Sequence, residues 1–268
     1  MKTRILIGGA IVFALGMLAA AEAVRADLVV HEWGTFLAMN GSDGVSLDGM
    51  YHEEHALPPF VHSRSRDQLR LPLSLLKGET PVIYFYTRQP SRVQVQVGFP
   101  TGLWTQWYPQ ASMVGPGLVQ VGSPPQTRNG RISWNVEVVP SAAVSTKLPV
   151  TSSDALWNHA REVDAAYVSA VNTARAGAPR EWERFIFYRG LGQAPLPITV
   201  RAGEGRIHAT ATEPDGLRHV FILRVENGRG AYEYVPALAS ARRLERAVPA
   251  MDAALPVERF AGRIADDG

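Results

Sequence analysis

Alternation of apolar and polar residues is the dominant pattern along the chain after residue 80. In the segment 92–99, Val93, Val95 and Val97 alternate with polar residues, and the segment 131–139 alternates in the same way. A period of two places successive side chains on opposite faces of a β-strand. Short alternating segments separated by turn residues are typical of antiparallel sandwiches. The chain is therefore predicted to be mainly β, with an antiparallel β-sandwich-like domain.

The segment 28–37 differs because it carries apolar residues on both of its faces. As a strand, it would place His31 and Trp33 on one face and Glu32 on the other. Strands that are apolar on both sides are usually covered on both sides. We therefore expect this strand to be internal to its sheet, and Gly34 predicts a bulge or a close backbone approach.

Two segments show a helical pattern instead. A packed α-helix over about 153–176 is predicted by apolar residues at helical spacing, namely Leu156, Ala160, Val163, Tyr167 and Val171. The chain is also expected to be helical from residue 237 to Val248, where Pro249 ends the helix. Residues 237–268 are accordingly predicted to be a C-terminal helical tail.

The clearest local signal is Asn227-Gly228 between two β segments, which is typical of a two-residue hairpin. The cross-strand pairs that this turn sets are Glu226 with Arg229, Leu223 with Tyr232, and Phe221 with Tyr234. We expect the last two pairs to lie on a buried face, where they stabilise the hairpin.

Residues 1–26 are interpreted as a signal peptide. Lys2 and Arg4 precede an apolar stretch over 5–20, and small residues suited to signal peptidase end at Ala26 and at Ala23. Cleavage after Ala26 is favoured, cleavage after Ala23 is the alternative, and an uncleaved anchor helix is a third reading. The protein is then expected in the periplasm or outside the cell, with residues 27–236 forming a single β-rich domain.

Composition narrows the range of partners and bonds. The 268 residues contain 27 Lys or Arg and 25 Asp or Glu, and removal of Lys2, Arg4, Arg25 and Glu22 leaves 24 of each. A neutral mature chain gives no support to a nucleic-acid partner. The chain has no cysteine, which excludes disulfides and thiolate metal sites. No second long apolar run follows the signal, so no membrane span is expected after cleavage.

The densest candidate chemistry is a metal site. His31, His52, Glu53 and His55 offer the imidazole and carboxylate groups that suit zinc or a similar divalent ion. Glu53 or Glu54 would then be the candidate catalytic base of a hydrolase. The alternative is architectural, because this HEEH pattern does not match HExxH. In that reading His31 is a hydrogen-bonded core residue and the HEEH loop is simply solvated.

Three aromatic residues within five positions are candidates for ligand binding. Trp104, Trp107 and Tyr108 follow a turn, and aromatic rings exposed on a β scaffold stack on sugars or on apolar peptide segments. The alternative is core packing, although a regular strand would turn one of the two tryptophans outward. The ligand could thus be a small molecule, a glycan or a protein.

Arg189 is a further candidate, since it follows a predicted strand and enters a glycine-rich turn. Its guanidinium could bind a carboxylate or phosphate with two parallel hydrogen bonds. The alternative that we prefer is an internal ion pair with Glu32 or Glu79.

A set of longer motifs resembles one protein family. The motifs are VVHEWGTF, GSDG with LDGMYHEE and LPPFVHSR, ETPVIYFYT, VGFPTGLWTQWYPQAS and FIFYRGLG. Together, over about residues 29–196, they resemble a family of uncharacterised exported bacterial proteins with an HEWGTF signature near the mature N-terminus. The resemblance implies export and no particular activity. Members of that family are often longer, so the C-terminal part of this chain is expected to be shortened.

Two functions are therefore carried forward from the sequence. The first is an exported β-rich protein that acts through a ligand- or partner-binding surface. The second is a metal-dependent hydrolase that uses His31 and the loop from His52 to His55.

Overall fold

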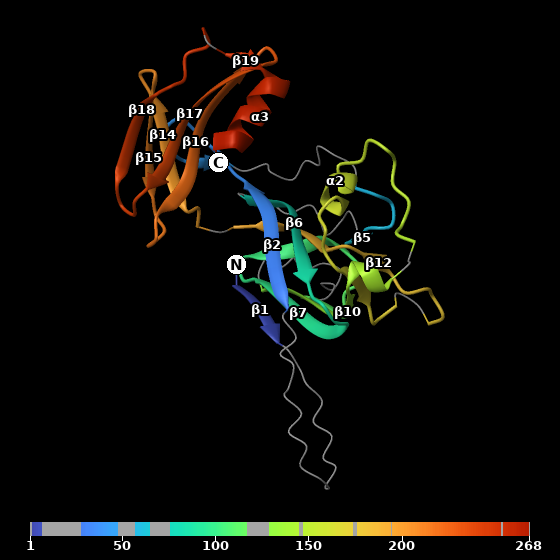
Figure 1. Cartoon of the computed structure of the whole chain (residues 1–268). Helices are drawn as coiled ribbons and strands as arrows, with labels where there is room; N and C mark the ends of the chain where they lie inside the picture. The colour runs from blue at the N-terminus through green and yellow to red at the C-terminus, as the bar shows by residue number, and fades with distance from the viewer. Residues whose placement is uncertain are drawn as a thin grey trace, which may run out of the picture. The chain divides into compact units, whose positions relative to one another are not determined.

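The computed structural model describes residues 2–6, 28–47, 57–64, 76–116, 129–144, 147–173, 176–193, 195–252 and 254–267. It confirms the predicted fold class, since 53% of the structure is strand and 8% is helical. The chain forms two compact units (Figure 1). Unit 1 consists of Met1–Ala38 and Asp48–Ala194, and unit 2 consists of Met39–Leu47 and Pro195–Gly268. The chain thus does not form the single domain over 27–236 that the sequence suggested.

Unit 1 is built on two antiparallel sheets. Sheet A has the order β1 (Lys2–Leu6), β7 (Ser91–Phe99), β10 (Gly130–Val139), β11 (Tyr167–Ala170) and β12 (Trp182–Glu183), and β9 (Met113–Gly115) also pairs with β10. Sheet B has the order β2 (Val29–Leu37), β6 (Leu76–Tyr86), β13 (Ile186–Gly192), β8 (Gly102–Tyr108) and β5 (His62–Ser63).

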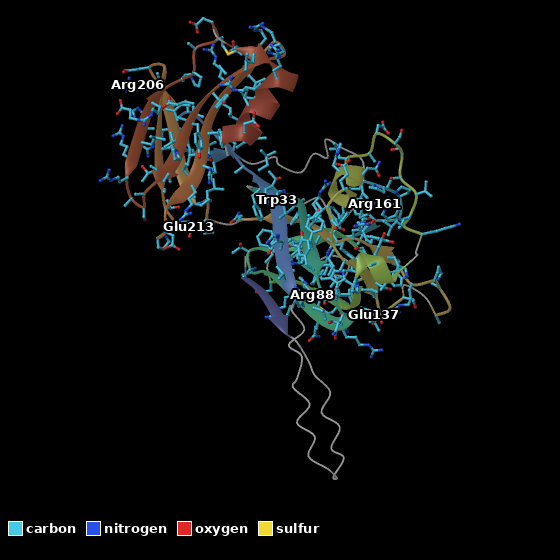
Figure 2. All side chains as sticks on the ribbon, viewed as in Figure 1. Trp33, Arg88, Glu137, Arg161, Arg206 and Glu213 are labelled. Atoms are coloured by element: carbon cyan, nitrogen blue, oxygen red, sulfur yellow. The ribbon has the colours of Figure 1, made fainter. Side chains whose placement is uncertain are left out.

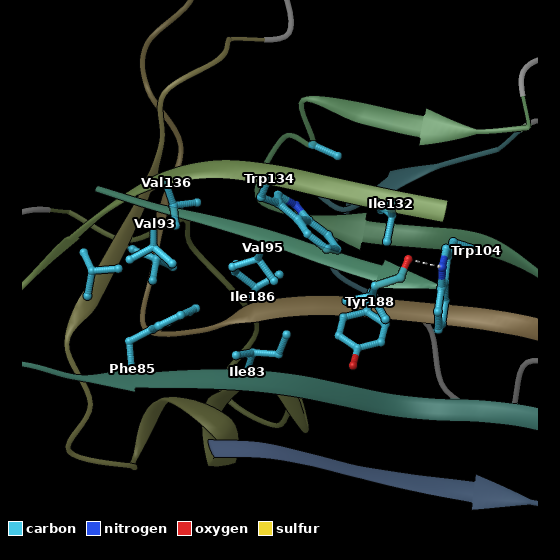
Figure 3. Packing of buried hydrophobic residues seen from close by; sticks show 14 of the residues in the cluster. Ile83, Phe85, Val93, Val95, Trp104, Ile132, Trp134, Val136, Ile186 and Tyr188 are labelled. Carbon is cyan, nitrogen blue, oxygen red and sulfur yellow. Dashed lines mark hydrogen bonds between the residues drawn. The ribbon is translucent and has the colours of Figure 1, made fainter. Parts of the chain in front are cut away.

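The core of unit 1 lies between these sheets (Figure 3). Sheet A contributes the alternating residues that the sequence predicted, including Val95 on β7 and Trp134 on β10, both fully buried. Sheet B contributes Ile83, Ile186 and Tyr188 from the other side. The indole N–H of Trp134 donates to the backbone carbonyl of Pro109, so the one polar side-chain atom of this tryptophan has a hydrogen-bond partner within the core. The two sheets therefore form the expected sandwich.

A third layer covers the outer face of sheet B. It consists of the segment 57–61 and the short helix α2 (Trp157–Arg161), which pack on Tyr84, Tyr108 and Phe187. Every residue of β13 is buried, because this strand has the sandwich core on one face and the third layer on the other. The doubly covered strand of the fold is thus β13.

The predicted helix over 153–176 is wrong in length. The helix contains only five residues, and the chain then continues into β11, where Val168 pairs with Val138. Tyr167 and Val168 are aromatic and β-branched, and pairing with β10 outweighs the helical spacing of the apolar residues. The one other short helical segment of unit 1 in the described residues is the 3-10 turn Ser141–Ala143.

Unit 2 is a smaller β sandwich with its own core. One sheet has the order β14 (Ile198–Gly203), β15 (Arg206–Ala211) and β18 (Arg243–Ala247), and the other has β16 (Leu217–Glu226), β17 (Arg229–Leu238) and β19 (Leu255–Pro256). A two-stranded sheet of β3 (Met39–Asn40) and β4 (Ser46–Leu47) accompanies them. Residues of both larger sheets, such as Ala209, Leu244, Ile222 and Val235, share one hydrophobic cluster. This separate core explains why the chain divides into two units.

The hairpin at Asn227-Gly228 has the predicted register in all three pairs. Its faces are reversed, however, since Ile222 and Val235 face the core while Leu223 is exposed. Both alternating sets of the hairpin are apolar, so the sequence pattern alone did not distinguish the two faces.

The C-terminal tail is only partly helical. Residues Arg243–Ala247 form β18 instead of the expected helix, because Leu244 pairs with Ala209 and enters the core of unit 2. The helix of this region is α3 (Val257–Asp267), and its Phe260 packs on Tyr232 with ring centroids 5.7 Å apart.

The N-terminal residues Lys2–Leu6 pair with β7, whereas residues 7–27 lie outside the described part of the chain. The signal peptide therefore stays a prediction. Among the described residues, no helix is both long and apolar enough to cross a membrane.

Candidate functional site

The HEWGTF segment lies on β2, which is the edge strand of sheet B in the described structure. The expectation that it is an internal strand covered on both faces is wrong. Of its nine residues, only Val30 is partly buried, and the others are exposed. The prediction assumed that a strand with apolar residues on both faces is buried on both faces. In β2, however, apolar residues remain exposed at the surface.

The two faces of β2 have different surroundings. His31 lies opposite Tyr84 and its ring meets the edge of Tyr86, with centroids 5.5 Å apart. Trp33, two residues further on the same face, is 75% exposed (Figure 2). Glu32 points the other way and accepts a hydrogen bond from the hydroxyl of Tyr188 in the sandwich core. The predicted separation of His31 and Trp33 from Glu32 is thus present.

The hydrogen bond from the Tyr188 hydroxyl to Glu32 connects β2 to the sandwich core. Burial raises the pKa of Tyr188 far above its usual value, and the charge of Glu32 and the hydrogen bond to it act in the same direction. Tyr188 is therefore a neutral donor to Glu32 at neutral pH.

Gly34 lies at a close backbone approach, which is one of the two alternatives that the sequence predicted for it. A Cβ at Gly34 would lie 2.8 Å from the Cα of Pro81. The pairing of β2 with β6 shifts between Trp33 and Thr35, and the extra residue lies on β6, where Thr80 and Pro81 face the single residue Gly34.

Four apolar side chains are exposed along the strand. We call them the β2 patch, which consists of Val29, Trp33 and Leu37 on one face and of Phe36 on the other. Edge strands of natural proteins are usually protected by Lys, Pro or charges, and the sequence VVHEWGTFL has Glu32 as its one charged residue and has no Lys, Arg or Pro.

A second polar arrangement lies at the opposite edge of sheet B. The Nε2 atom of His62 on β5 is 2.9 Å and 3.0 Å from the two carboxylate oxygens of Glu181. Glu181 also accepts the backbone N–H of Gln110 at 2.6 Å, while the His62 ring stacks near Trp107 and Tyr108. The pair orients the imidazole firmly. Sequence reasoning missed it, because the two residues are 119 positions apart and follow no motif.

His31 and His62 cannot bind one metal ion together. They lie on the two edge strands of sheet B with three strands between them, which corresponds to about 19 Å at the usual strand spacing. The other predicted metal-site residues, His52, Glu53, Glu54 and His55, lie outside the described part of the chain. Within the described residues, no group of three or more His, Asp or Glu side chains could hold an ion.

The aromatic run on β8 is packed inside unit 1. Trp104 and Tyr108 are 1% and 2% exposed, and Trp107 is partly buried against the same core as Trp104. The register of β8 with β13 shifts beside Arg189, so the two tryptophans face the same way although they are three residues apart. The prediction that one of them faces outward assumed a regular strand and is wrong. Trp104 and Tyr108 are therefore core residues, as the alternative reading of the sequence expected.

Arg189 is also internal, with only 4% of its surface exposed. Its Nη1 atom lies 3.4 Å from the side-chain oxygen of Gln106, and its guanidinium lies over Phe187 at 6.0 Å. Glu32 accepts a hydrogen bond from Tyr188, the neighbour of Arg189, and the expected ion pair of Arg189 with Glu32 or Glu79 stays a prediction. Arg189 is thus not displayed on the surface as an anion clamp.

Sequence reasoning also missed a buried ion pair that fixes the third layer. The carboxylate of Glu183 is fully buried and accepts hydrogen bonds from Arg161 at 2.6 Å and from the indole N–H of Trp157 at 2.9 Å. Burial, followed by the charges of Glu181 and Glu183, raises the pKa of Tyr108 well above its usual value, against a smaller lowering by Arg161. This ion pair ties α2 to β12 of sheet A, with the Glu183 side chain fully buried and that of Arg161 15% exposed.

The fold defines an antiparallel β-sandwich protein in which β2 is an edge strand of sheet B among the described residues. Comparison with protein-family models, with curated proteins and with solved structures found no match in any of the three. Membership of the HEWGTF family therefore stays a prediction.

Proposed function

We propose that this chain is an exported β-rich protein that binds an extended segment of a partner protein along β2. The observation that carries the proposal is the 75% exposure of Trp33 on an edge strand of sheet B in the described structure. Burial of such a large aromatic side chain is a major source of binding free energy at interfaces. The backbone of the edge would pair with the partner, and the β2 patch would select its apolar side chains.

Two features favour a peptide over a glycan. Val29, Phe36 and Leu37 extend the exposed surface beyond the single indole, and they offer sugars few hydrogen bonds. The edge itself supplies backbone donors and acceptors at the spacing of another strand, which an extended peptide matches.

Site-specific photocrosslinking tests the proposal in cells that export the protein. A photoreactive amino acid is placed at Trp33 and, as a control, at Val150, which is 89% exposed in a loop of the same unit. We expect a discrete protein adduct from position 33 and none from position 150. Equal labelling from both positions, or no protein adduct at position 33, would contradict the proposal. Quenching of Trp33 by oligosaccharides without any protein adduct would assign the surface to glycans instead.

A metal-dependent hydrolase is the second candidate, supported by the exposed position of the His31 ring on β2. His31 would bind a divalent ion such as zinc together with His52, Glu53 and His55, and Glu53 or Glu54 would act as the base. Metal analysis of the wild type, His31→Ala and His52→Ala tests this reading. It requires a stoichiometric ion that both variants lose, and a metal-free protein with an unchanged melting temperature in chelator would exclude it.

A further inference from the structure

We infer that unit 2 binds an anionic polysaccharide on the outer face of the sheet formed by β14, β15 and β18 (Figure 1). The inner face of this sheet enters the core of unit 2 through residues such as Ala209 and Leu244. The opposite face carries charged side chains. We call it the basic face, and its charged positions are Arg201, Arg206, His208, Arg243 and Glu245. These residues belong to unit 2, so this site is additional to the strand-binding site proposed on β2.

Positive charge is concentrated on the basic face. Unit 2 as a whole has 10 Arg, no Lys and 11 Asp or Glu, so it is nearly neutral. The basic face carries three of these arginines and a single carboxylate, that of Glu245. The Nε atom of Arg206, labelled in Figure 2, lies 2.6 Å from Glu245 and offsets its charge. Arg201 and Arg243 therefore leave the face cationic, which favours an anionic partner.

The strand register places a histidine between these two arginines. Arg201 on β14 lies directly opposite His208 on β15, and Arg243 on β18 lies opposite Thr210, two residues further along β15. The Nη2 atom of Arg243 is 2.8 Å from Nδ1 of His208. Because a guanidinium can only donate, Nδ1 is the acceptor and the imidazole proton lies on Nε2. This Nε2–H has no hydrogen-bond partner among the described residues, so it can donate to an oxyanion.

The stem of Arg201 is packed although its charge is not paired. Its Cγ and Nε atoms lie 2.9 Å and 3.3 Å from the place of a Cβ on Gly44, in the turn between β3 and β4. Asp43 of the same turn accepts the backbone N–H of Val45 at 3.0 Å. In the described part of the chain, the Arg201 guanidinium has no ion-pair partner. A positioned side chain with an unpaired charge binds an anion with a smaller loss of entropy.

The uncharged positions of the face distinguish among anionic partners. Thr199 and Thr210 lie opposite each other and offer hydroxyl groups to the hydroxyls of a sugar. The three strands place no Phe, Tyr or Trp on this face for stacking on nucleic-acid bases. They also place no apolar side chain larger than that of Ala247 there, so nothing would enter a membrane. A polysaccharide with carboxylate or sulfate groups fits this combination of arginines and hydroxyls.

Calorimetric titration of the purified full-length protein with polygalacturonate, heparin and neutral dextran tests the inference. We expect a charged polymer to bind, with an affinity that falls as salt is added, and dextran not to bind. Arg201→Gln combined with Arg243→Gln should weaken this binding at least about tenfold, because two charge-assisted contacts are lost. The matched control combines Arg218→Gln with Arg263→Gln, which removes the same charge from exposed positions outside the basic face and should bind like the wild type.

Both double variants should keep the wild-type melting temperature, because all four arginines are exposed. Arg201→Glu alone provides a second test that leaves the contact of Arg243 with His208 intact, and it should also weaken binding. Absence of binding, equal losses in the two double variants, or wild-type affinity of Arg201→Glu would overturn the inference. Binding to phosphatidylglycerol vesicles but to neither charged polymer would assign the face to a membrane and would overturn it as well.

Discussion

Removal of the Glu183 carboxylate should destabilise unit 1 more than any other single change of charge in its described residues. Glu183 is 0% exposed, and its oxygens accept hydrogen bonds from Arg161, from the Trp157 indole and from the backbone N–H of Arg184. In Glu183→Ala, the Arg161 guanidinium and the Trp157 N–H both lose their acceptor while they remain largely inside the protein.

The size of the effect follows from what is left behind. Breaking a buried ion pair on one side destabilises a protein by about 3–5 kcal/mol, because an uncompensated charge remains. A matched control is Glu137→Ala, since Glu137 pairs with Arg180 at 2.9 Å but both side chains are more than a third exposed. Such surface pairs contribute about 0–1 kcal/mol. The two variants remove the same chemical group and differ in burial.

Tryptophan fluorescence is the appropriate assay. All six tryptophans lie in the ranges that form unit 1, so urea unfolding followed by fluorescence reports unit 1 alone. We expect the free energy of unfolding to fall by at least about 2 kcal/mol more in Glu183→Ala than in Glu137→Ala. The double variant Glu183→Leu with Arg161→Met should recover part of the loss, because an apolar pair leaves no buried charge. Equal stability of the two alanine variants would refute the reasoning.

Three other predictions concern packing and pH. Gly34→Ala should destabilise unit 1 by about 1–3 kcal/mol in urea unfolding, because its Cβ would lie 2.8 Å from the Cα of Pro81; wild-type stability would contradict the close approach. Burial, chiefly, raises the pKa of Tyr84 from 10.0 to about 12. Because the folded state holds this proton more tightly, the stability it contributes is full below pH 10 and is lost as the pH rises towards 12; Tyr84→Phe should flatten that decline in unfolding curves, and an unchanged slope would refute it. Gly230→Ala should loosen α3, because its Cβ would lie 2.7 Å from the Phe260 ring; faster proteolysis of the C-terminal residues is the expected readout, and wild-type resistance would contradict it.

The local features that the sequence predicted correctly are those determined by neighbouring residues. The alternation around Val95 and the turn at Asn227-Gly228 gave the sheet core and the hairpin register, because strand period and turn type are short-range properties. The close backbone approach at Gly34 was predicted as one of two alternatives for the same reason. The prediction of a helix over 153–176 failed because Val168 pairs with β10, a strand that is distant in sequence.

The polar sites show a stronger dependence on tertiary structure. The contacts of His62 with Glu181 and of Arg161 with Glu183 form only in the folded unit 1, and no spacing in the chain encodes them. The prediction for the aromatic run on β8 failed for a different reason. One bulge beside Arg189 turns Trp104 and Trp107 to the same side of the strand. An irregularity of one residue reverses every face assignment that follows it.

The HEWGTF strand combines a firmly anchored inner face with an uncovered outer face. Glu32 is held by the Tyr188 hydroxyl, and Val30 packs against the core, so the backbone of β2 is fixed without help from its outer side chains. The outer residues, Trp33 above all, are therefore not needed to hold the strand in place. This exposed indole on an edge strand is the reason for proposing a contact with another chain. A fixed backbone would lower the entropy lost when a partner strand docks on β2.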